Sequence, residues 1–505
     1  MDIDIIEEAQ AAGASSQSVR KPIIALVDDA HPFDLEGYIS NYTGRTAIER
    51  LIHIVVTCPT IAAEAYQLCV QHIHQSRDPG LYQNLLSAYE QAQAYNQSQV
   101  GEGATVLPDP MEIAQLDTRW MDETLAKNAA DRGKLEVELK TYTNNMIKES
   151  IRMAHRDLGD FYRQVGDYAT SLKHYTKSRE FCTTSQHVLE MCLSVLELLI
   201  EQRNYSHLST YVFKADAALD AATAAANAAS SSEGAGASGA GAAAKKKATS
   251  SAERDAVQSK LDLATALSYM GQGNYEKAGQ YFLKIGPAKE LGDWVGKLIA
   301  PGDITIYTTL CALATFQRAS IKGRLLENAT FSLYIEQEPY IRELVQAYLN
   351  SNFKVVLELL SRYSTRHYVD IHLAPHVQNL TNLIRNWAVV LYFQPFATIR
   401  LDRMSTAFGW TVEEVEEQVV GLIQSGEIQG RVDSQNKILQ AKQTDYRADL
   451  VARSIKLAND IQATNRKLLL RMRLQQADLV IKPPKGSGHH GQLQGTLAEF
   501  MAGGD

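Results

Sequence analysis

Apolar residues recur at helical spacing along most of the chain. Two such stripes lie near the N-terminus, one formed by Ile48, Leu51, Ile52, Val55 and Val56 and one by Ala65, Leu68 and Cys69. Pro59 separates them, at a point where a helix should stop and restart. A further helical run extends from about Leu116 to Tyr142. Sustained two-residue alternation first appears at Ile428, so the pattern predicts an all-α protein.

A repeated pattern of small and aromatic residues begins within 155–178. Its matched positions are His155, Leu158, Gly159, Tyr162, Gly166, Tyr168, Ser171, Tyr175 and Ser178. This spacing is typical of a tetratricopeptide hairpin, in which small residues let two helices approach and aromatic residues fill the gaps. Weaker copies centre on Tyr205, Tyr275 and Phe353. Because such hairpins bury their faces only by stacking, we predict a helical-repeat solenoid rather than an irregular helical bundle with coincidental spacing.

An alanine-rich stretch interrupts the repeats. Between Ala215 and Ala244, 16 of 30 residues are alanine, and Lys245, Lys246 and Lys247 follow. Alanine favours helix, so 215–229 can extend the preceding helix. The part SSSEGAGASGAGAAA is rich in Gly and Ser and offers little to bury, which predicts a flexible linker. We interpret it as a tolerated surface insertion rather than a functional segment.

The pattern changes after Pro375. A broad apolar face predicts a helix over 376–393, and shorter helices are predicted over 401–408 and 411–423. Thr411 and Glu414 form a capping box at the start of the third helix, and Gly426 follows its end. The stretches 428–432 and 438–440 then alternate around the turn DSQNK, as in a β-hairpin. Three helices followed by a hairpin predict a winged-helix domain.

The last predicted helix, 445–481, is long and amphipathic. Its apolar positions are spaced by alternating steps of four and seven residues: Tyr446, Leu450, Leu457, Ile461, Leu468, Met472 and Leu479. An 11-residue repeat keeps such a stripe nearly straight along a helix. The stripe requires a partner surface, because apolar surface left in water favours association. It can pack against the chain's own solenoid, but we favour an intermolecular bundle because the helix follows a terminal domain.

Composition and charge narrow the class of protein. The chain has 505 residues, a formal charge of −8 and an apolar share of 45%, which suits a soluble protein with about three folded units. The start MDIDIIEEAQ lacks the basic and apolar regions of a signal peptide. The longest apolar stretches fall short of a membrane span. Five cysteines, none in a C-x-x-C pair, indicate a reducing, intracellular compartment.

The chemistry-bearing patterns are weak. Gly271–Tyr275 (GQGNY) resembles a phosphate-binding loop but follows a helix, so we interpret it as a repeat turn. Cys69, His72 and His74 lack a fourth ligand at zinc spacing. His72 and His74 also match the H-x-H that opens the zinc isopeptidase motif, but the serine and aspartate that this motif requires are replaced by Tyr82 and Leu85. We therefore predict a non-enzyme with no cofactor, no metal and no catalytic residues.

The winged helix raises the alternative of DNA binding. Its third helix, which would enter the major groove, carries Glu413, Glu414, Glu416 and Glu417. Across 400–442 there are five basic and seven acidic residues, so the phosphates of DNA would be repelled. Basic residues gather instead in 445–485, with nine Lys or Arg and four Asp. A nucleic-acid contact there stays open, although a solvated helix face is the commoner explanation.

A repeat solenoid leading into an acidic winged helix and a final bundle helix resembles the PCI domain family, found in the proteasome lid, the COP nine signalosome and translation initiation factor three. The segments 33–54, 147–193, 310–318 (LCALATFQR) and 373–442 are similar to the subunit-one family of the COP nine signalosome. The equivalent proteasome-lid family is the alternative. The stretch 215–250 departs from the family, being longer and simpler.

The resemblance implies a non-catalytic scaffold. The signalosome removes the ubiquitin-like modifier Nedd-eight from cullin–RING ligases, and its zinc lies in an MPN-type subunit. Winged-helix edges would join other PCI and MPN subunits, above all subunits two and three, through Ile428, Val432, Ile438 and Leu439 by β-augmentation. The stripe from Tyr446 to Leu479 would enter a shared helical bundle. The concave surface of the solenoid and the N-terminal helices would contact cullin–RING ligases transiently, in cytoplasm and nucleus, with no membrane contact.

These patterns divide the chain into eight parts. We predict a disordered acidic tail (1–30), an N-terminal helical region (31–145), tetratricopeptide-like repeats (146–214), an Ala/Gly/Ser/Lys-rich linker (215–255), helical repeats forming the first half of the PCI domain (256–375), the winged helix (376–442), the bundle helix (445–481) and a disordered tail (482–505).

Overall fold

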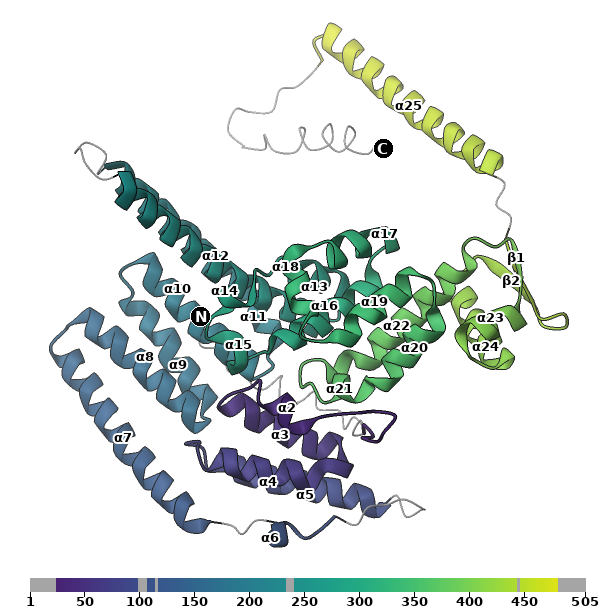
Figure 1. The fold of residues 1–505 in the computed structure, drawn as a ribbon. Coiled ribbons are helices and arrows are strands. Elements are labelled where there is room, and N and C mark those ends of the chain that lie inside the picture. Colours follow the sequence, from purple (N-terminus) through teal and green to yellow (C-terminus); the bar gives the residue numbers. More distant parts are fainter. Residues whose placement is uncertain (1–23, 99–106, 114–116, 233–239, 443–445, 480–505) are drawn as a thin grey trace. The chain divides into compact units, whose positions relative to one another are not determined.

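The computed structural model describes residues 24–98, 107–113, 117–232, 240–442 and 446–479. These residues are helical apart from one small sheet, which confirms the predicted all-α solenoid followed by a winged helix (Figure 1). The chain divides into two compact units, residues 1–428 with 432–439 and residues 429–431 with 440–505. In the described ranges no single helix is long and apolar enough to span a membrane. The helices Arg45–Thr57 and Pro59–Ile73, which are bent at the break between them, would meet the length and composition criteria only if taken together.

The N-terminal region is a small helical bundle. Leu51, Ile54, Ala65, Tyr66 and Leu85 are fully enclosed in its core. Pro59 begins a 3-10 turn between two helices, as the sequence predicts. The elements are α2 (Leu35–Ile39), α3 (Arg45–Thr57), η1 (Pro59–Ile61), α4 (Ala62–Ile73), α5 (Gly80–Ser98) and α6 (Pro110–Ile113).

The predicted disordered tail, residues 1–30, includes residues that are part of the folded structure. The prediction was wrong for 24–30, where the chain is attached to the folded body. The Ala25 amide donates to the Thr57 carbonyl at 2.9 Å, and the Leu26 carbonyl accepts from Thr365 at 2.6 Å. Ala25 is buried against the N-terminal core, which explains why this stretch is held in place. The remainder of the predicted tail lies outside the described residues.

The first predicted repeat forms a closely packed helical hairpin. A Cβ added at Gly159 in α8 would come within 2.5 Å of the Tyr175 ring in α9, so only glycine permits this approach. Asp167 caps α9 by accepting from the Thr170 amide at 3.1 Å. The elements of this region are α7 (Thr118–Asn144), α8 (Lys148–Val165), α9 (Tyr168–Ser178), η2 (Arg179–Phe181), α10 (Ser185–Glu201) and α11 (Tyr205–Ser232).

Most of the predicted linker is helical. Helix α11 continues to Ser232, and α12 (Ala240–Gly271) begins inside the alanine-rich stretch. The expectation of a flexible segment was therefore wrong for 240–255, because the alanines and lysines there are strong helix formers. Residues 233–239, which hold the glycines of the predicted linker, lie outside the described part of the chain.

The second set of repeats surrounds one deeply buried helix, α16 (Pro301–Thr315), in which every side chain from Asp303 to Ala314 is buried. Trp294 is also fully enclosed, and its indole donates to Glu197 of α10 at 2.8 Å. The other elements are α13 (Tyr275–Phe282), α14 (Ala288–Leu291), α15 (Trp294–Lys297), α17 (Arg318–Ile321), the π-helix η3 (Lys322–Leu326), α18 (Ala329–Ile335), α19 (Pro339–Leu349), α20 (Phe353–Arg362) and α21 (Ser364–Tyr368).

The winged helix has the predicted helices and one additional strand. Thr411 and Glu414 make both hydrogen bonds of the predicted capping box, at 3.3 and 3.0 Å. The three strands lie in the order β1–β3–β2, so β3 is central. The elements are α22 (Ala374–Phe393), β1 (Thr398–Arg400), α23 (Leu401–Phe408), α24 (Val412–Gln424), β2 (Gly430–Asp433) and β3 (Ile438–Ala441).

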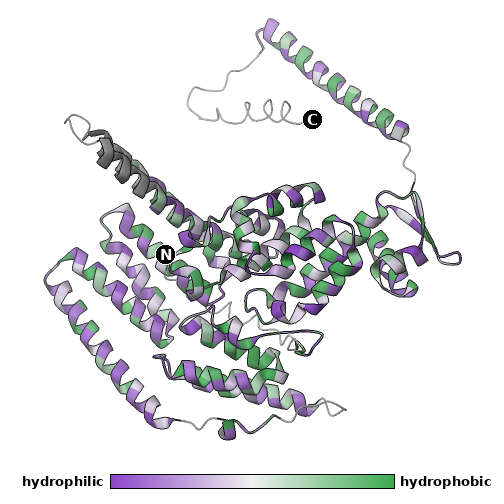
Figure 2. Ribbon diagram, in the orientation of Figure 1, coloured by the Kyte–Doolittle hydropathy of each residue, from purple (hydrophilic) through white to green (hydrophobic). Residues whose placement is uncertain are grey.

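The predicted bundle helix is α25 (Tyr446–Gln476), drawn yellow in Figure 1. It ends five residues before the predicted end at 481, and a turn follows in which the Leu479 amide donates to the Leu474 carbonyl at 3.0 Å. Hydrophobic and hydrophilic residues are interspersed along its whole length (Figure 2).

Candidate interaction surfaces

The first-turn tyrosines of three repeats bond to residues outside their own hairpins. The Tyr168 hydroxyl donates to Glu49 of α3 at 3.1 Å, and the Tyr205 hydroxyl bonds to the His372 ring at 2.7 Å. Tyr275 bonds to the His376 ring at 3.2 Å. The repeats therefore present these residues to α3 and to the segment that enters α22.

Helix α3 contacts the first of these tyrosines and further residues of the repeats. Besides Glu49, its side chains contact residues far along the chain, with Thr46 donating to the Lys297 carbonyl and the His53 ring bonding to the Tyr368 carbonyl at 3.0 Å. The expectation that the concave surface and the N-terminal helices contact cullin–RING ligases stays a prediction, and the residues through which α3 contacts the repeats are occupied within the chain. The apolar stripe of α3 packs against α4 and α5 in the N-terminal core, whereas polar side chains of α3 make these contacts with the repeats.

A buried charge network connects α3 to the second set of repeats. Arg50 of α3 donates to Asp370 at 2.7 Å and to Asp303 of α16 at 3.1 Å. Arg366 donates to the other oxygen of Asp303 at 2.8 Å and to Glu338 at 3.3 Å. Arg50 is fully buried, as are both aspartates. The network thus holds two guanidinium groups among three carboxylates.

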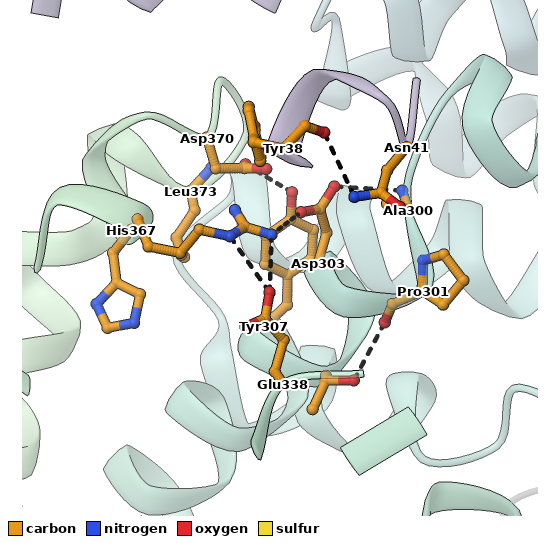
Figure 3. Close-up of polar contacts among 12 residues, drawn as sticks. Tyr38, Asn41, Ala300, Pro301, Asp303, Tyr307, Glu338, His367, Asp370 and Leu373 are labelled. Atoms are coloured by element: carbon orange, nitrogen blue, oxygen red, sulfur yellow. Dashed lines mark hydrogen bonds and ion pairs between the residues drawn. The ribbon is translucent and has the colours of Figure 1, made fainter. Parts of the chain in front are cut away.

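Tyrosines complete this network. Tyr307 donates to Asp370 at 2.6 Å and Tyr42 donates to Asp303 at 2.5 Å, while Tyr38 accepts from Arg50 at 2.5 Å. Figure 3 shows Tyr38, Asp303, Tyr307 and Asp370 gathered between the elements that carry them. A buried charge is tolerated only when it is paired and hydrogen-bonded. These contacts pair both guanidinium groups with carboxylates, and leave Arg50 Nε and Arg366 Nη1 buried without a hydrogen-bond partner.

The carboxylates of the network respond differently to burial. Burial alone would raise the pKa of Asp370, but the charge of Arg50 and the hydrogen bonds from Tyr307 and Arg50, together with His372, outweigh it, and the pKa lies below its usual value. For Glu338 burial dominates and raises the pKa despite the nearby Arg366. Burial lowers the pKa of the neighbouring His367 to about 3 and that of His372 to about 4. The two histidines are therefore neutral near pH 7.

The residues considered for metal binding lie in different surroundings. Cys69 is enclosed in the N-terminal core, where burial raises the pKa of its thiol. His74 is exposed and packs edge-on against Trp120, with ring centroids 5.1 Å apart. Among the residues that the structure describes, no group of three or more His, Cys, Asp or Glu is arranged to hold a metal ion. Asn274 of GQGNY caps α13, as expected for a repeat turn.

The four predicted edge residues occupy different positions in the wing. Ile428 and Leu439 are buried in the domain's own core, and Val432 and Ile438 are half-buried. Ile438 and Leu439 belong to the central strand β3, which is paired on both sides. The prediction was therefore wrong in giving these two residues an open edge. Strand β1, which the sequence pattern does not reveal, takes up that side of β3.

The remaining open edge at this hairpin is β2. The Lys442 amide donates to the Gln429 carbonyl at 2.9 Å, which pairs residue 429 with 442. In an antiparallel hairpin every second pair is hydrogen-bonded, so 431 and 433 also face β3. The backbone N–H and C=O groups of Gly430 and Val432 therefore point away from the sheet. A further strand would add at these two residues.

The acidic side of the winged helix is partly neutralised within the domain. Glu416 pairs with Lys437 at 2.6 Å, and Ser434 also donates to it. Glu413, Glu414 and Glu417 are exposed. Three exposed carboxylates on the helix that would enter a DNA groove leave this surface unfavourable for a polyanion.

The predicted stripe of α25 is exposed wherever its side chains are described. The exposed fraction is 55% for Leu457 and 52% for Ile461, and Leu450, Leu468, Met472 and Leu479 are similar. The Tyr446 side chain lies outside the described part of the chain. Large apolar side chains are exposed in this way when they form an interaction surface.

Sequence reasoning missed the buried network entirely. The sequence feature that could have revealed the network is the presence of charged residues inside apolar patterns. Arg50 lies within the apolar stripe of α3, and Asp303 precedes the apolar run ITIYTTLCALA. A charged residue at a core position requires a buried partner. The partner's identity is not visible in the sequence, because Arg50 and Asp370 are 320 residues apart.

Comparison with known proteins covers nearly all of these elements. A family model described as 26S proteasome subunit RPN7 matches residues 117–324, and a PCI domain model matches residues 339–443. The chain is 31% identical to COP9 signalosome complex subunit 1b of Drosophila melanogaster, covering 92% of this chain and 90% of that protein. It is 30% identical to COP9 signalosome complex subunit 1 of Arabidopsis thaliana, covering 92% and 93%.

The chain is also similar, more distantly, to a subunit of the proteasome, the alternative family. The chain is 22% identical to 26S proteasome non-ATPase regulatory subunit 6 of Oryza sativa subsp. japonica, covering 41% of this chain and 54% of that protein. The match is shorter and weaker than those to the signalosome subunits. The predicted preference for the signalosome family over the lid family is therefore confirmed.

Proposed function

Because this chain belongs to the family of COP9 signalosome complex subunit 1, we propose that it is a non-catalytic scaffold subunit that supports removal of Nedd-eight from cullin–RING ligases by another subunit. The observation that carries the scaffold role is the exposed apolar stripe of α25, which follows the PCI region directly. A side-chain set of this kind is suited to association rather than to chemistry.

The absence of a catalytic role rests on the resemblance and on the chain's own residues. The family places the zinc that performs deneddylation in an MPN-type subunit. In the ranges that the structure describes, this chain offers no cluster of metal ligands and buries Cys69 in its core. The contribution to the reaction is then to position other subunits and the substrate.

The partners follow from the two surfaces. The open edge of β2 accepts a strand from a neighbouring PCI subunit, with subunits two and three as the expected neighbours. Helix α25 enters a bundle with helices of other PCI and MPN subunits. Contact with cullin–RING ligases is transient, and the expected locations are cytoplasm and nucleus.

Reconstitution tests this proposal. The full chain is co-expressed with the other signalosome subunits of the same source, and the complex is examined by native mass spectrometry and by cullin deneddylation. We expect stoichiometric incorporation, no deneddylation by the isolated chain, and loss of incorporation when Leu457, Ile461 and Leu468 are changed to Asp. Activity of the isolated chain would contradict the non-catalytic role.

A matched control keeps the added charge but changes the face. Ala452→Asp, Asn459→Asp and Ala463→Asp place three carboxylates on the opposite side of α25, because 100° separates successive residues of a helix. This variant should assemble like the unmodified chain. If both triple variants assembled normally, the bundle role of α25 would be wrong.

A further inference from the structure

A pocket opens between the π-helix η3 and the two helices that follow it, α18 and α19. Its volume is about 170 Å³, whereas a single water requires about 10–15 Å³, so the pocket can hold an aliphatic side chain. Ile335, which is buried, forms part of its apolar wall. The lining residues are Leu326, Ser332, Ile335, Glu336, Pro339 and Arg342.

Charged groups stand beside the apolar wall of this pocket. Arg342 and Glu336 are exposed, and Arg342 forms no ion pair with any residue that the structure describes. The nearby carboxylate of Glu338 is paired with Arg366 at 3.3 Å. An apolar pocket beside an unpaired guanidinium group suits a ligand in which an aliphatic side chain lies next to a carboxylate.

The helix η3 adds positive charge on the side of Leu326. Lys322 and Arg324 are exposed on it, and the guanidinium of Arg324 lies over the Phe316 ring at 5.4 Å. The stretch 317–326 contains three cations and no Asp or Glu. A π-helix is rare and occurs frequently at functional sites, which makes this pocket the strongest candidate for a ligand outside the surfaces described above.

The N-terminal stretch of the chain joins the folded body close to this pocket. The Leu26 carbonyl accepts from Thr365 at 2.6 Å, and the next residue, Arg366, donates to Glu338 at 3.3 Å. Glu338 is followed directly by Pro339 of the pocket wall. Two side-chain contacts therefore connect the start of the described chain with the pocket.

The residues that precede this point carry the matching chemistry. The segment 2–8 reads DIDIIEE, in which three isoleucines are mixed with four carboxylates, and 1–19 contains no Lys or Arg. The 15 residues 9–23 that follow the segment reach at most about 50 Å, which is ample for a pocket this close. A tether of this length holds the segment at a local concentration of about millimolar, so a weak contact is sufficient. Residues 480–505, by contrast, carry two Lys for two acidic residues.

We propose that the segment 2–8 docks in this pocket of its own chain. One isoleucine side chain enters against Ile335, and a neighbouring carboxylate pairs with Arg342. The other carboxylates lie toward the cations of η3. The docked segment covers the surface formed by η3, α18 and α19, so a partner that uses this surface has to displace it. The inference does not depend on the proposed function, because it concerns contacts within one chain.

Photo-crosslinking of the full chain tests the proposal. A benzophenone amino acid replaces Gln10, which lies just after the segment, and mass spectrometry identifies the residues to which it becomes joined. We expect crosslinks to residues within 322–342. An equal mixture of ¹⁵N-labelled and unlabelled chains separates contacts within one chain from contacts between copies, because only the latter give mixed pairs.

Substitutions on both sides of the contact should lower the yield of this crosslink. Ile3→Ser/Ile5→Ser/Ile6→Ser should lower it at least about tenfold, because the apolar anchor is lost. Arg342→Glu should lower it about threefold to fivefold, because an attractive surface pair becomes a repulsive one. Arg403→Glu is the matched control, since it makes the same charge change at an exposed arginine of α23 and should leave the yield unchanged. Equal melting temperatures of the two arginine variants show that folding is intact.

Each other occupant gives a different result. Mixed isotope pairs alone would assign the pocket to a second copy of the chain. A benzophenone at Glu336 that becomes joined to another subunit in the assembled signalosome, with no crosslink from position 10 in the isolated chain, would assign it to a partner. Either result overturns the proposal, as do crosslinks outside 322–342, no crosslink at all, or equal yields in Arg342→Glu and Arg403→Glu.

Discussion

At the scale of single residues, Arg50 joins parts of the chain that are far apart in sequence. Its guanidinium contacts Asp303 and Asp370, which lie 253 and 320 residues later. Arginine suits this position, because its planar group donates several hydrogen bonds in fixed directions and stays charged when buried. Each contact compensates for part of the hydration lost on burial, so removing one member leaves the others without a counter-charge.

Replacing Asp370 tests this dependence. We expect Asp370→Asn to lower the free energy of unfolding by about 3–5 kcal/mol, because Arg50 would stay buried with a weaker counter-charge. Chemical denaturation of the full chain measures the change. Glu123→Gln is the control, since it breaks the exposed ion pair with Arg119 and should cost about 0.5 kcal/mol or less. Equal effects of the two substitutions would contradict the role of the network.

A pair of neighbouring histidines predicts that the stability of the folded chain depends on pH. The Nδ1 atoms of His155 in α8 and His174 in α9 lie 3.0 Å apart. One Nδ1 therefore carries a proton and donates it, and the other Nδ1 accepts without a proton of its own. Burial, together with the charge of the partner ring and of Lys177, lowers the pKa of His155 to about 4. Burial also lowers the pKa of His174.

The sign of the effect follows from the lowered pKa. Below about pH 6.5 the unfolded chain binds protons that the folded pair does not, so stability falls as the pH decreases from 6.5 toward 4. His155→Gln should make the melting temperature less sensitive to pH over that range. Melting temperatures of the unmodified chain and of His155→Gln are measured between pH 4 and 7.5. If the two melting temperatures changed with pH in parallel, the histidine pair would not contribute to the pH dependence of stability.

At the scale of elements, periodicity predicted helices well and strands poorly. Helices α22 and α24 begin within two residues of their predicted starts, because their apolar faces and the Thr411 capping box are local signals. Strand β1 has three residues, too few to show alternation. Its pairing with β3 decides which edge is open, so the predicted edge residues on β3 were wrong for a reason that only the sheet order reveals.

The register of β2 gives a prediction for its open edge. Val432→Pro removes an N–H that points outward, so the isolated chain should melt within a few degrees of the unmodified chain while assembly weakens. Arg431→Pro removes an N–H that faces β3 and should destabilise the wing itself. Assembly of the Val432→Pro variant at normal affinity would show that the edge of β2 does not receive a partner strand.

At the scale of the whole molecule, the N-terminal helices belong to the solenoid rather than to a separate module. Helix α3 contacts residues from α9 to Asp370, which lies just before α22. The predicted boundary at residue 145 marks where the repeats begin, but it does not mark an independent folding unit. Sequence patterns show which faces are apolar, whereas the pairing of α3 with distant repeats depends on contacts that no local pattern contains.

Cleavage of the chain tests whether the N-terminal helices are bound to the repeats. A protease site inserted in 99–106 separates the described N-terminal helices from the rest after cleavage. The two pieces should migrate together in gel filtration at micromolar concentration, because Arg50, Thr46 and His53 of α3 remain bound to residues of the second piece. Asp370→Asn in the cleaved protein should weaken this association. Separation of the unmodified pieces would show that α3 is a peripheral attachment.

The sequence separation of 320 residues between Arg50 and Asp370 also delays their contact during synthesis of the chain. A ribosome adds about 5–20 residues per second, so Arg50 is made about 15–60 s before its partner emerges. During that interval Arg50 and the face of α3 that later meets the repeats have no completed surface to pack against, although Leu51 and Ile54 can already pack in the N-terminal core. Nascent chains of this protein should therefore depend on chaperones that shield the first helices until residue 370 has left the ribosome.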